Sequence, residues 1–331
     1  MVTYTLVKFK NMTPLHIGTG KENYDFSSSD LHSDTLSAAL AAIKMQMAEE
    51  HDLMSFLESF VVSSAFPFIE DRYFLPKPYG KINVEVVDAD EYMVRKKLKK
   101  LRFVETSLWN KLIKGEKLTV RDWQLKGAFL LPSDFPEAKF IVPSKSQVNQ
   151  RVSVPRENGM DAEPFFFEWT FFGVNSGLYC LLDASADKKE ELFQLFERLG
   201  EEGIGTDRNL GGGKFEVESA ELFIPEVDSA DSTLLLSLFI PTEEELPLLN
   251  LEHSRYELLQ RGGYMSGSQE IDFRHLWKKS VYMFKAGSVF CMTDSLKGKV
   301  VDLRPDWNDK RMHPVFRSGK PFVVPIKNTE L

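Results

Sequence analysis

The sequence predicts an α+β protein made of two units. Its 331 residues are about twice the length of one ordinary domain. Up to about residue 225, the patterns follow the order strand, helix, strands, helix, strand, which is the order of a split β-α-β unit. Apolar residues make up 43% of the chain and charged residues 27%, which supplies a sizeable core and excludes a disordered protein. We therefore expect a ferredoxin-like (RRM-like) domain over residues 1–225 and a smaller one of the same kind over 226–331.

The first strand and the first helix follow from the spacing of apolar residues. Residues 2–10 alternate between apolar and polar side chains, as a strand does, and a loop over 11–30 follows. Ser33 or Asp34 can cap the next helix, because apolar residues then recur every three or four positions. Asp34 could instead be a catalytic carboxylate, but its place at a helix start makes capping the simpler account.

The elements that follow are expected to be short. A helix over 53–63 leads into a hairpin over 66–75, which prolines close. Residues 95–102 form a basic amphipathic segment, and a further helix turn is expected near Trp109. A basic run of this kind is commonly a solvated helix face, but it could also neutralise phosphates.

A protruding finger is expected between two apolar stems at 140–142 and 165–167. The stretch between the stems, residues 143–164, is polar. It contains several polar and basic side chains, namely Lys145, Asn149, Gln150, Arg151, Arg156 and Asn158.

The first domain is expected to end with a strand at 178–182, a helix at 188–199 and a strand at 214–224. An acidic stretch at 225–232 reads as a linker. Four short apolar runs then predict a β-rich second domain, at 234–240, 256–260, 281–285 and 289–292.

Charge is distributed unevenly along the chain. The net charge of −8 hides a basic region, 76–126, with 13 Lys/Arg against 7 Asp/Glu, and an acidic region, 183–257, with 6 against 19. The basic region could meet phosphates and the acidic one a basic protein surface, since the local field selects partners.

Several classes of protein are excluded or disfavoured. No apolar stretch approaches the roughly 20 residues of a membrane span, and the N-terminus lacks the apolar core of a signal peptide, so we expect a cytoplasmic protein with no membrane partner. Neither the histidines nor Cys180 and Cys291 have metal-ligand spacing. We therefore assign no metal and no cofactor.

The strongest local signal is a glycine-rich loop over 203–213. Five glycines in eleven positions could leave amide N–H groups free to point at an anion, and Arg208 and Lys214 add positive charge. A P-loop is disfavoured because Phe215 follows the lysine, and a dinucleotide site because the loop precedes a strand. The alternative is a turn that serves only tight packing.

A second glycine loop, His16-Ile17-Gly18-Thr19-Gly20, directly follows the first strand. His16 would need a partner within hydrogen-bond reach to act as a general base. A structural or RNA-contacting histidine is the simpler account.

Four segments, in this order, resemble the RAMP superfamily of CRISPR proteins. They are Pro14-Leu15-His16-Ile17-Gly18-Thr19-Gly20, the helix entry Leu31-His32-Ser33-Asp34-Thr35-Leu36, the hairpin exit Tyr73-Phe74-Leu75-Pro76-Lys77-Pro78, and the glycine-rich loop before its strand. Residues 148–159, followed by Phe165-Phe166-Phe167-Glu168, are similar to the thumb hairpin of the family. Within the family, the likeness is to the subunit that caps type III-A (Csm) effector complexes at the 5′ tag of the CRISPR RNA.

The resemblance implies a cleft for the RNA backbone, bordered by the two glycine loops and entered by the thumb. It implies RNA-binding roles for the following residues: His16, Gly18, Asn149, Gln150, Arg151, Gly205, Arg208, Gly211, Gly212, Gly213 and Lys214. Members that cut a target carry an aspartate near the corresponding helix. Asp34 belongs to a widespread helix entry, so we expect no catalytic residue.

The leading hypothesis is a non-catalytic RNA-binding scaffold in antiviral defence. It would hold the 5′ tag of the CRISPR RNA and dock two proteins, the large multidomain subunit through the acidic region and the repeated backbone subunit. The alternative is a metal-independent endoribonuclease that processes CRISPR repeat RNA with His16 as acid or base. A third hypothesis is a nucleotide-binding regulator that uses the loop at 203–214.

Overall fold

The computed structural model describes most of the chain, namely residues 2–18, 24–47, 52–137, 140–155, 161–265, 273, 276–292, 295–306 and 311–328. Four residues singled out above, Thr19, Gly20, Arg156 and Asn158, lie outside the described residues. The described α-helices are α1 (Ser33–Met47), α2 (Leu53–Glu58), α3 (Glu91–Lys100), α4 (Thr106–Ile113) and α5 (Ala186–Glu202). Within the described part, no helix has the length and apolar character needed to cross a membrane.

A large central sheet organises the molecule. Its strands run in the order β13-β1-β12-β3-β4-β6-β9-β8, and β2 also pairs with β12. Their bounds are β1 (Val2–Lys10), β2 (Phe60–Val62), β3 (Phe66–Ile69), β4 (Arg72–Pro76), β6 (Phe103–Glu105), β8 (Leu125–Lys126), β9 (Phe129–Leu130), β12 (Ser176–Ala184) and β13 (Glu216–Ile224). The predicted chain order of strand, helix, strands, helix, strand is confirmed by β1, α1, β3, β12, α5 and β13.

The middle of this sheet is buried on both faces. Side chains on one face of β1 and β12, including Val7 and Cys180, join a core that contains apolar residues of α1 and α5. Leu6 and Leu181 on the opposite face join a second core that contains Leu234 and other residues of the C-terminal strands. The two predicted units therefore share a core, and the sheet has no open face there for a ligand.

The C-terminal part forms small antiparallel sheets, β17-β14-β20, β15-β16 and β18-β19. Their strands are β14 (Ser232–Leu235), β15 (Leu258–Arg261), β16 (Val281–Phe284), β17 (Val289–Phe290), β18 (Val300–Asp302), β19 (Phe316–Ser318) and β20 (Val323–Ile326). The described residues after Ile224 include the 3-10 helix η4 (Leu246–Leu249) but no α-helix, whereas a ferredoxin-like unit has two. The described residues therefore do not show a second ferredoxin-like domain. Leu234 of β14 instead packs directly on the central sheet, at the place where such a domain would have a helix layer of its own.

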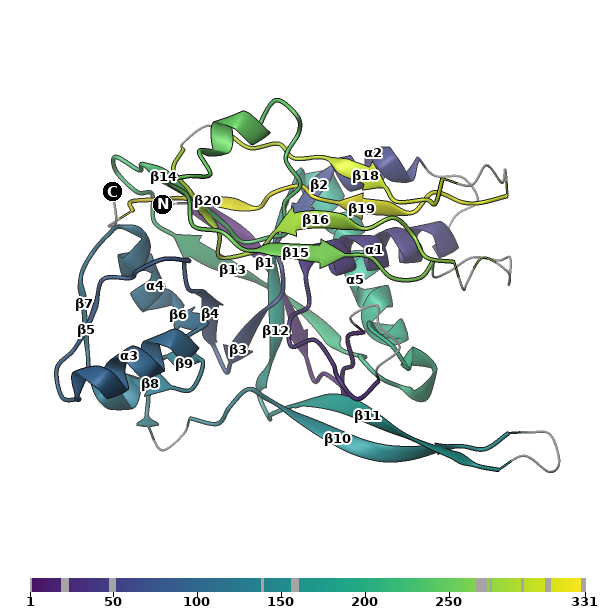
Figure 1. Cartoon of the computed structure of the whole chain (residues 1–331), viewed down its shortest axis with the longest axis horizontal. Helices are drawn as coiled ribbons and strands as arrows, with labels where there is room; N and C mark the ends of the chain where they lie inside the picture. Colours follow the sequence, from purple (N-terminus) through teal and green to yellow (C-terminus); the bar gives the residue numbers. More distant parts are fainter. Residues whose placement is uncertain are drawn as a thin grey trace.

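A long two-stranded hairpin, β10 (Ser144–Ser153) and β11 (Glu163–Phe172), projects from the body of the molecule (Figure 1). The expected stem at 140–142 is wrong, because Phe140 instead packs against the rings of Phe129 and Phe135. The polar stretch itself forms the first strand of the hairpin. Both faces of this strand are largely exposed to solvent, so its residues need not alternate between apolar and polar. For this reason the sequence pattern did not reveal that the stretch is a strand.

The segment between β4 and β9 contains α3, α4 and a parallel pair, β5 (Val84–Val86) and β7 (Leu118–Val120). The predicted basic helix near 95–102 and the predicted hairpin over 66–75 are confirmed as α3 and as β3-β4. The helix expected over 53–63 is wrong beyond Glu58. Phe60 and Val62 are buried there in β2, paired with Ala184 and Leu182 of β12.

Candidate nucleic-acid interface

The two glycine loops lie against each other at one end of the central sheet. Because β1 and β13 are antiparallel neighbours with Lys10 opposite Glu216, the loop after β1 and the loop before β13 meet there. The amide of Thr206 donates to the carbonyl oxygen of His16 at 3.0 Å, and the amide of Gly213 donates to that of Pro14 at 2.9 Å. The sequence-predicted glycine loops therefore form one structure.

The glycines permit this close approach. A Cβ atom at Gly213 would lie 1.9 Å from the carbonyl oxygen of Ile204, and one at Gly205 would lie 2.3 Å from that of His16. A Cβ atom at Gly212 would lie 2.6 Å from the ring of Trp169 in β11. Only a residue without a side chain fits at these positions.

The backbone amides of the loop are largely occupied. Those of residues 203, 204, 206 and 210–214 all donate hydrogen bonds within the protein, for example from Ile204 to the carbonyl oxygen of Gly213 and from Lys214 to the hydroxyl of Thr13. The expectation that these amides point freely at an anion is therefore wrong for these eight positions. A loop folded between a helix end and a neighbouring loop uses its own amides for packing, which was the alternative interpretation of this motif.

The cations of the loop are available instead. Arg208, in the 3-10 turn η3 (Arg208–Leu210), and Lys214 are both exposed, and neither forms an ion pair among the described residues. Gly18 and Gly211 lie at the rim, and no described atom comes within 4 Å of a Cβ atom placed at Gly211. This rim offers positive charge to a ligand in solvent.

His16 is an interior residue. Its side chain is 1% exposed, its Nδ1 lies 2.7 Å from the carbonyl oxygen of Glu168, and its ring centroid lies 4.4 Å from that of Phe167. These contacts make His16 a packing link between the first loop and the base of the hairpin.

Arg151 joins the hairpin to the glycine-rich loop. Its Nη1 lies 2.6 Å from Oδ2 of Asp207, and its guanidinium lies over the rings of Phe167 at 4.2 Å and Trp169 at 5.2 Å. Asn149 shares the face of Arg151, because side chains alternate along a strand. Gln150 points to the opposite face, so the three predicted thumb residues are divided between two faces.

Sequence reasoning missed an aromatic surface beside this base. Tyr24 stacks on Phe167 with ring centroids 5.9 Å apart, and it is 52% exposed, while Phe26 is 59% exposed. The amide of Glu168 donates to the carbonyl oxygen of Tyr24 at 2.9 Å, which fixes the loop on the hairpin. Two aromatic residues in an otherwise polar loop were the available signal. Exposed rings of this kind are the platforms on which unpaired bases stack.

Asp34 has a role that differs from the predicted cap. Its side chain is fully buried and accepts hydrogen bonds from Nε of Arg261 at 2.7 Å and from Nη1 of Arg317. Burial alone would raise the pKa of Asp34, but Arg317 and Arg261 outweigh it and hold that pKa well below its usual range. Asp34 therefore anchors helix α1 to two C-terminal strands, β15 and β19.

Other chemistry is limited in the described part of the chain. No group of three or more His, Cys, Asp or Glu side chains could hold a metal ion there. Cys180 is buried within β12, and burial raises the pKa of its thiol well above the usual value. This thiol is therefore shielded from reaction.

Comparison with protein families gives two matches that together cover nearly the whole chain. Residues 8–216 match the model of the RAMP superfamily. Residues 228–326 match the model of the CRISPR Csm4 C-terminal domain.

Comparison with individual proteins agrees with these matches. The "CRISPR system Cms protein Csm4" of Thermococcus onnurineus (strain NA1) is 28% identical over 253 residues, or 74% of this chain and 78% of that protein. The protein of the same name from Streptococcus thermophilus is 25% identical over 345 aligned positions, covering 98% of this chain and all of that one.

Solved structures show that the fold is shared. A chain from the "Csm3-Csm4 subcomplex in the type III-A CRISPR-Cas interference complex" superposes with a TM-score of 0.63 at 16% identity, covering 99% of this chain and 100% of that one. A chain from a "Csm1-Csm4 cassette in complex with cA4" gives a TM-score of 0.61 at 18% identity, covering 98% of each chain.

Proposed function

The chain belongs to the RAMP superfamily and carries a Csm4 C-terminal domain, and from this we propose that it is a non-catalytic RNA-binding scaffold of a type III-A CRISPR effector complex. In this role it holds the 5′ tag of the CRISPR RNA in the cytoplasm. The observation that carries the proposal is the convergence of two glycine loops and the base of a projecting hairpin, with Arg208 and Lys214 exposed at the rim.

The division of labour at this site follows from its contacts. The occupied amides of the glycine-rich loop leave phosphate binding to side-chain cations, with Arg208 and Lys214 as the contributors. Asn149 and Gln150 supply base-edge contacts from the two faces of the thumb. Gly18 and Gly211 leave room at the rim for the RNA backbone, whereas Gly205, Gly212 and Gly213 act indirectly, by letting the two loops and the hairpin pack closely. His16 and Arg151 hold the parts of the cleft together.

The arrangement favours binding over cleavage. A catalytic carboxylate must reach the scissile group, but Asp34 is fully buried and paired with two arginines. His16, the candidate acid or base of the nuclease hypothesis, is 1% exposed and packed on Phe167. Incubating the purified chain with CRISPR repeat RNA in EDTA is expected to leave the RNA intact. Cleavage that is lost in His16→Ala would instead support the nuclease.

Two protein partners complete the proposal. Relatives named Csm4 occur in Csm1-Csm4 and Csm3-Csm4 structures, and we propose corresponding contacts for this chain with a large subunit and a backbone subunit. The exposed carboxylates of Glu243 and Glu244, next to the exposed side chains of Leu246 and Leu248, are the proposed contact for the large subunit.

Glu245 must be left out of the test of this contact. It is 8% exposed and accepts hydrogen bonds from the amide of Thr242 at 2.8 Å and from that of Lys297, so its replacement would disturb the fold. Glu243→Lys with Glu244→Lys is expected to weaken association with the large subunit and to change its salt dependence. Unchanged assembly across a salt series would refute this contact.

The domain assignment is part of the same proposal. The order β13-β1-β12-β3, with α1 and α5 on one face, supports a ferredoxin-like unit over residues 1–225 that includes the thumb at about 143–164. One family match ends at residue 216 and the other begins at residue 228, which supports a second unit over 226–331. The observed C-terminal strands support a β-rich cover for the central sheet in that unit.

Binding of labelled RNA tests the proposed site. Arg208→Ala with Lys214→Ala is expected to weaken binding of tag RNA and of scrambled RNA alike, and to flatten the salt slope by up to about two. Lys111→Ala with Lys114→Ala removes the same charge from an exposed residue of α4 and from the exposed residue that follows this helix, and serves as the control. Asn149→Ala is expected to change the preference for the tag sequence instead. Equal effects of the loop and control pairs would refute the site.

A further inference from the structure

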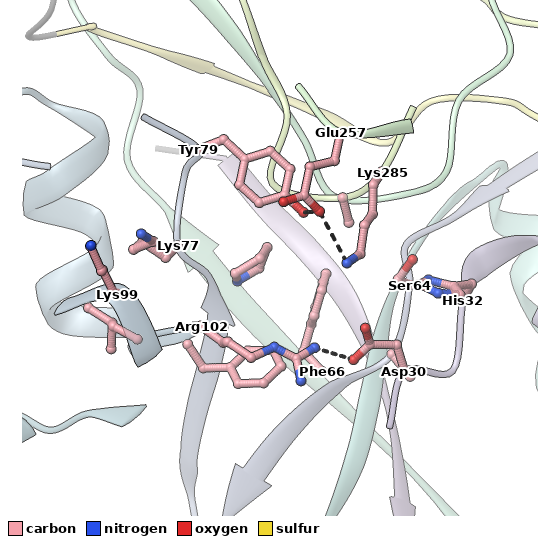
Figure 2. Close-up of a pocket in the computed structure, with 15 residues that line it drawn as sticks. Asp30, His32, Ser64, Phe66, Lys77, Tyr79, Lys99, Arg102, Glu257 and Lys285 are labelled. Carbon is pink, nitrogen blue, oxygen red and sulfur yellow. Dashed lines mark hydrogen bonds and ion pairs between the residues drawn. The ribbon is translucent and has the colours of Figure 1, made fainter. Parts of the chain in front are cut away.

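A pocket of about 340 Å³ lies apart from the glycine-rich loop, where several segments of the chain meet. Asp30 comes from the loop before α1, Lys77 and Tyr79 follow β4, Arg102 follows α3, and Lys285 follows β16 (Figure 2). A pocket of this volume is at the lower end of the range for small-ligand sites and has room for one nucleotide unit.

The pocket has more positive than negative groups. Arg102 pairs with Asp30, and Lys285 lies 3.4 Å from Glu257, whose carboxylate also accepts a hydrogen bond from the hydroxyl of Tyr79 at 3.1 Å. These pairs account for both carboxylates among the residues that line the pocket.

Lys77 and Lys99 are the remaining cations of the pocket. Figure 2 shows them on one side, away from the two paired groups. Neither forms an ion pair among the residues that the structure describes. The pocket therefore has an excess of two positive charges, which favours an anionic ligand.

Lys77 in particular is placed for an anion. It is half-buried, and burial lowers its pKa below the ordinary value. A partly desolvated ammonium without a counter-charge is unfavourable, and a phosphate beside it would offset that cost. Lys99 is exposed and lines the same pocket, so it can add a second contact to the phosphates of the same ligand.

The walls supply the second requirement of a nucleotide site. The rings of Phe66, Phe103 and Tyr79 line the pocket, and Phe103 is held by a stacked neighbour, Phe129, at 5.5 Å. Fixed aromatic walls beside cations are the combination that binds a base together with its phosphate.

A continuous loop connects this pocket to the base of the thumb. Tyr24 stacks on Phe167 of the thumb, and the amide of Ser27 donates to Oε2 of Glu168 at 2.6 Å. At the other end, Nη1 of Arg102 donates to Ser29 at 3.1 Å. Asp30 is the sixth residue after Tyr24, so this path is at most about 22 Å long. A strand of a few nucleotides can cover it, past the exposed ring of Phe26.

We propose that this pocket binds one phosphate-bearing nucleotide of the same single-stranded RNA that the thumb and glycine-rich loop contact, with Lys77 and Lys99 holding its phosphates. The inference rests on the proposed function and adds a second anchoring point to it. An RNA held at both points is fixed in direction and in register along the loop at 24–30.

Binding of labelled tag RNA to the full-length chain, measured across a salt series, tests the inference. Lys77→Ala with Lys99→Ala is expected to weaken binding severalfold and to flatten the salt slope by up to about two. The control, Lys111→Ala with Lys114→Ala, is expected to keep the slope of the parent protein. Because Lys77 has no ion pair and its charge is disfavoured by burial, the pocket variant should melt at or above the parent temperature.

The outcomes separate the pocket from the proposed function. If the pocket variant binds as the parent does while Arg208→Ala with Lys214→Ala binds weakly, the pocket inference is overturned and the proposed function stands. If the parent itself shows no affinity for RNA, the proposed function fails. RNA carrying 5-iodouridine should form photo-crosslinks at Tyr79 or Phe103, and crosslinks confined to the thumb would also overturn the inference.

A second experiment tests whether the pocket binds free nucleotides in place of RNA. Adenosine monophosphate and inorganic phosphate should raise the melting temperature weakly, and RNA should compete with both. A rise in melting temperature that Lys77→Ala abolishes, with RNA binding unaffected by that substitution, would identify a site for free nucleotides and overturn the assignment to RNA.

Discussion

Asp34 offers the sharpest test of how this chain is held together. Replacing it with Asn removes a fully buried carboxylate that accepts hydrogen bonds from Arg261, at 2.7 and 3.2 Å, and from Arg317. Arg317 is 7% exposed, so the substitution leaves a buried guanidinium without its counter-charge. Removing one partner of a buried ion pair costs about 3–5 kcal/mol. A domain of ordinary stability has roughly 5–15 kcal/mol in total, so Asp34→Asn should lose a large share of it.

Urea unfolding followed by tryptophan fluorescence measures this cost. The control is Asp134→Asn, which breaks an ion pair with Arg72 in which the aspartate is 63% exposed, and which should change stability by less than about 1 kcal/mol. Replacing the whole triad, with Asp34→Leu, Arg261→Met and Arg317→Met, should recover much of the loss because no charge is then left unpaired.

The same experiment distinguishes a structural from a catalytic aspartate. A carboxylate kept for catalysis is commonly dispensable for folding, so its loss would leave stability unchanged or raised while abolishing an activity. We expect the opposite for Asp34, a large loss of stability. A variant Asp34→Asn within about 0.5 kcal/mol of the parent protein would refute the account of this buried triad.

Three further predictions concern local contacts. Burial lowers the pKa of His32 to about 4, so as the pH falls the unfolded chain takes up a proton before the folded chain does. The free energy of unfolding should therefore fall by about 3 kcal/mol between about pH 6.5 and about pH 4. In urea unfolding at several pH values, His32→Gln should make this dependence on pH weaker, and an unchanged dependence would refute the assignment. Gly213→Ala should lower the free energy of unfolding by about 3 kcal/mol, measured by heat or urea. Gly211→Ala should lower it by about 1 kcal/mol, because its Cβ atom meets open space and only the φ of +84° is unfavourable. Similar losses in the two variants would contradict the packing role of the loop. Arg151→Ala should lower the local free energy of opening at the base of the hairpin by about 1 kcal/mol and so speed amide hydrogen exchange there. The exposed Arg95→Ala should not change this exchange, and equal exchange in the two variants would count against the contact of Arg151 with Asp207.

Local patterns in the sequence predicted the elements that depend on local forces. The alternation in β1, the apolar stripe of α1 and the β3-β4 hairpin all appear where expected, because each is specified by neighbouring residues. The partners of Asp34 lie 227 and 283 residues further along the chain, and no spacing rule connects them. For the same reason a capping role was the natural expectation for a residue that in fact fixes the C-terminal part to the first helix.

The candidate site shows a similar limit. The glycine motif was recognised, but glycine density alone does not distinguish an amide cradle from a tightly packed turn, since both require a backbone without side chains. The neighbours decide between them. Gly205 and Gly213 face carbonyl oxygens of the protein itself, which only the folded arrangement of β1 and β13 reveals.

These contacts limit the kind of RNA binding that the proposed function can involve. The middle of the central sheet is covered on both faces, so bases cannot stack on it. The backbone amides of the glycine-rich loop, which are uncharged donors suited to phosphates, are largely occupied by hydrogen bonds within the protein. In the proposed function, affinity for RNA would therefore come from side-chain cations, such as Arg208 and Lys214, and from exposed rings, such as Tyr24 and Phe26. Binding through cations releases counterions and falls steeply with salt, whereas stacking on rings does not. The salt slope of each variant therefore measures how much of the affinity comes from cations and how much from stacking. This ratio distinguishes binding by loops and rings from recognition of bases on an open sheet.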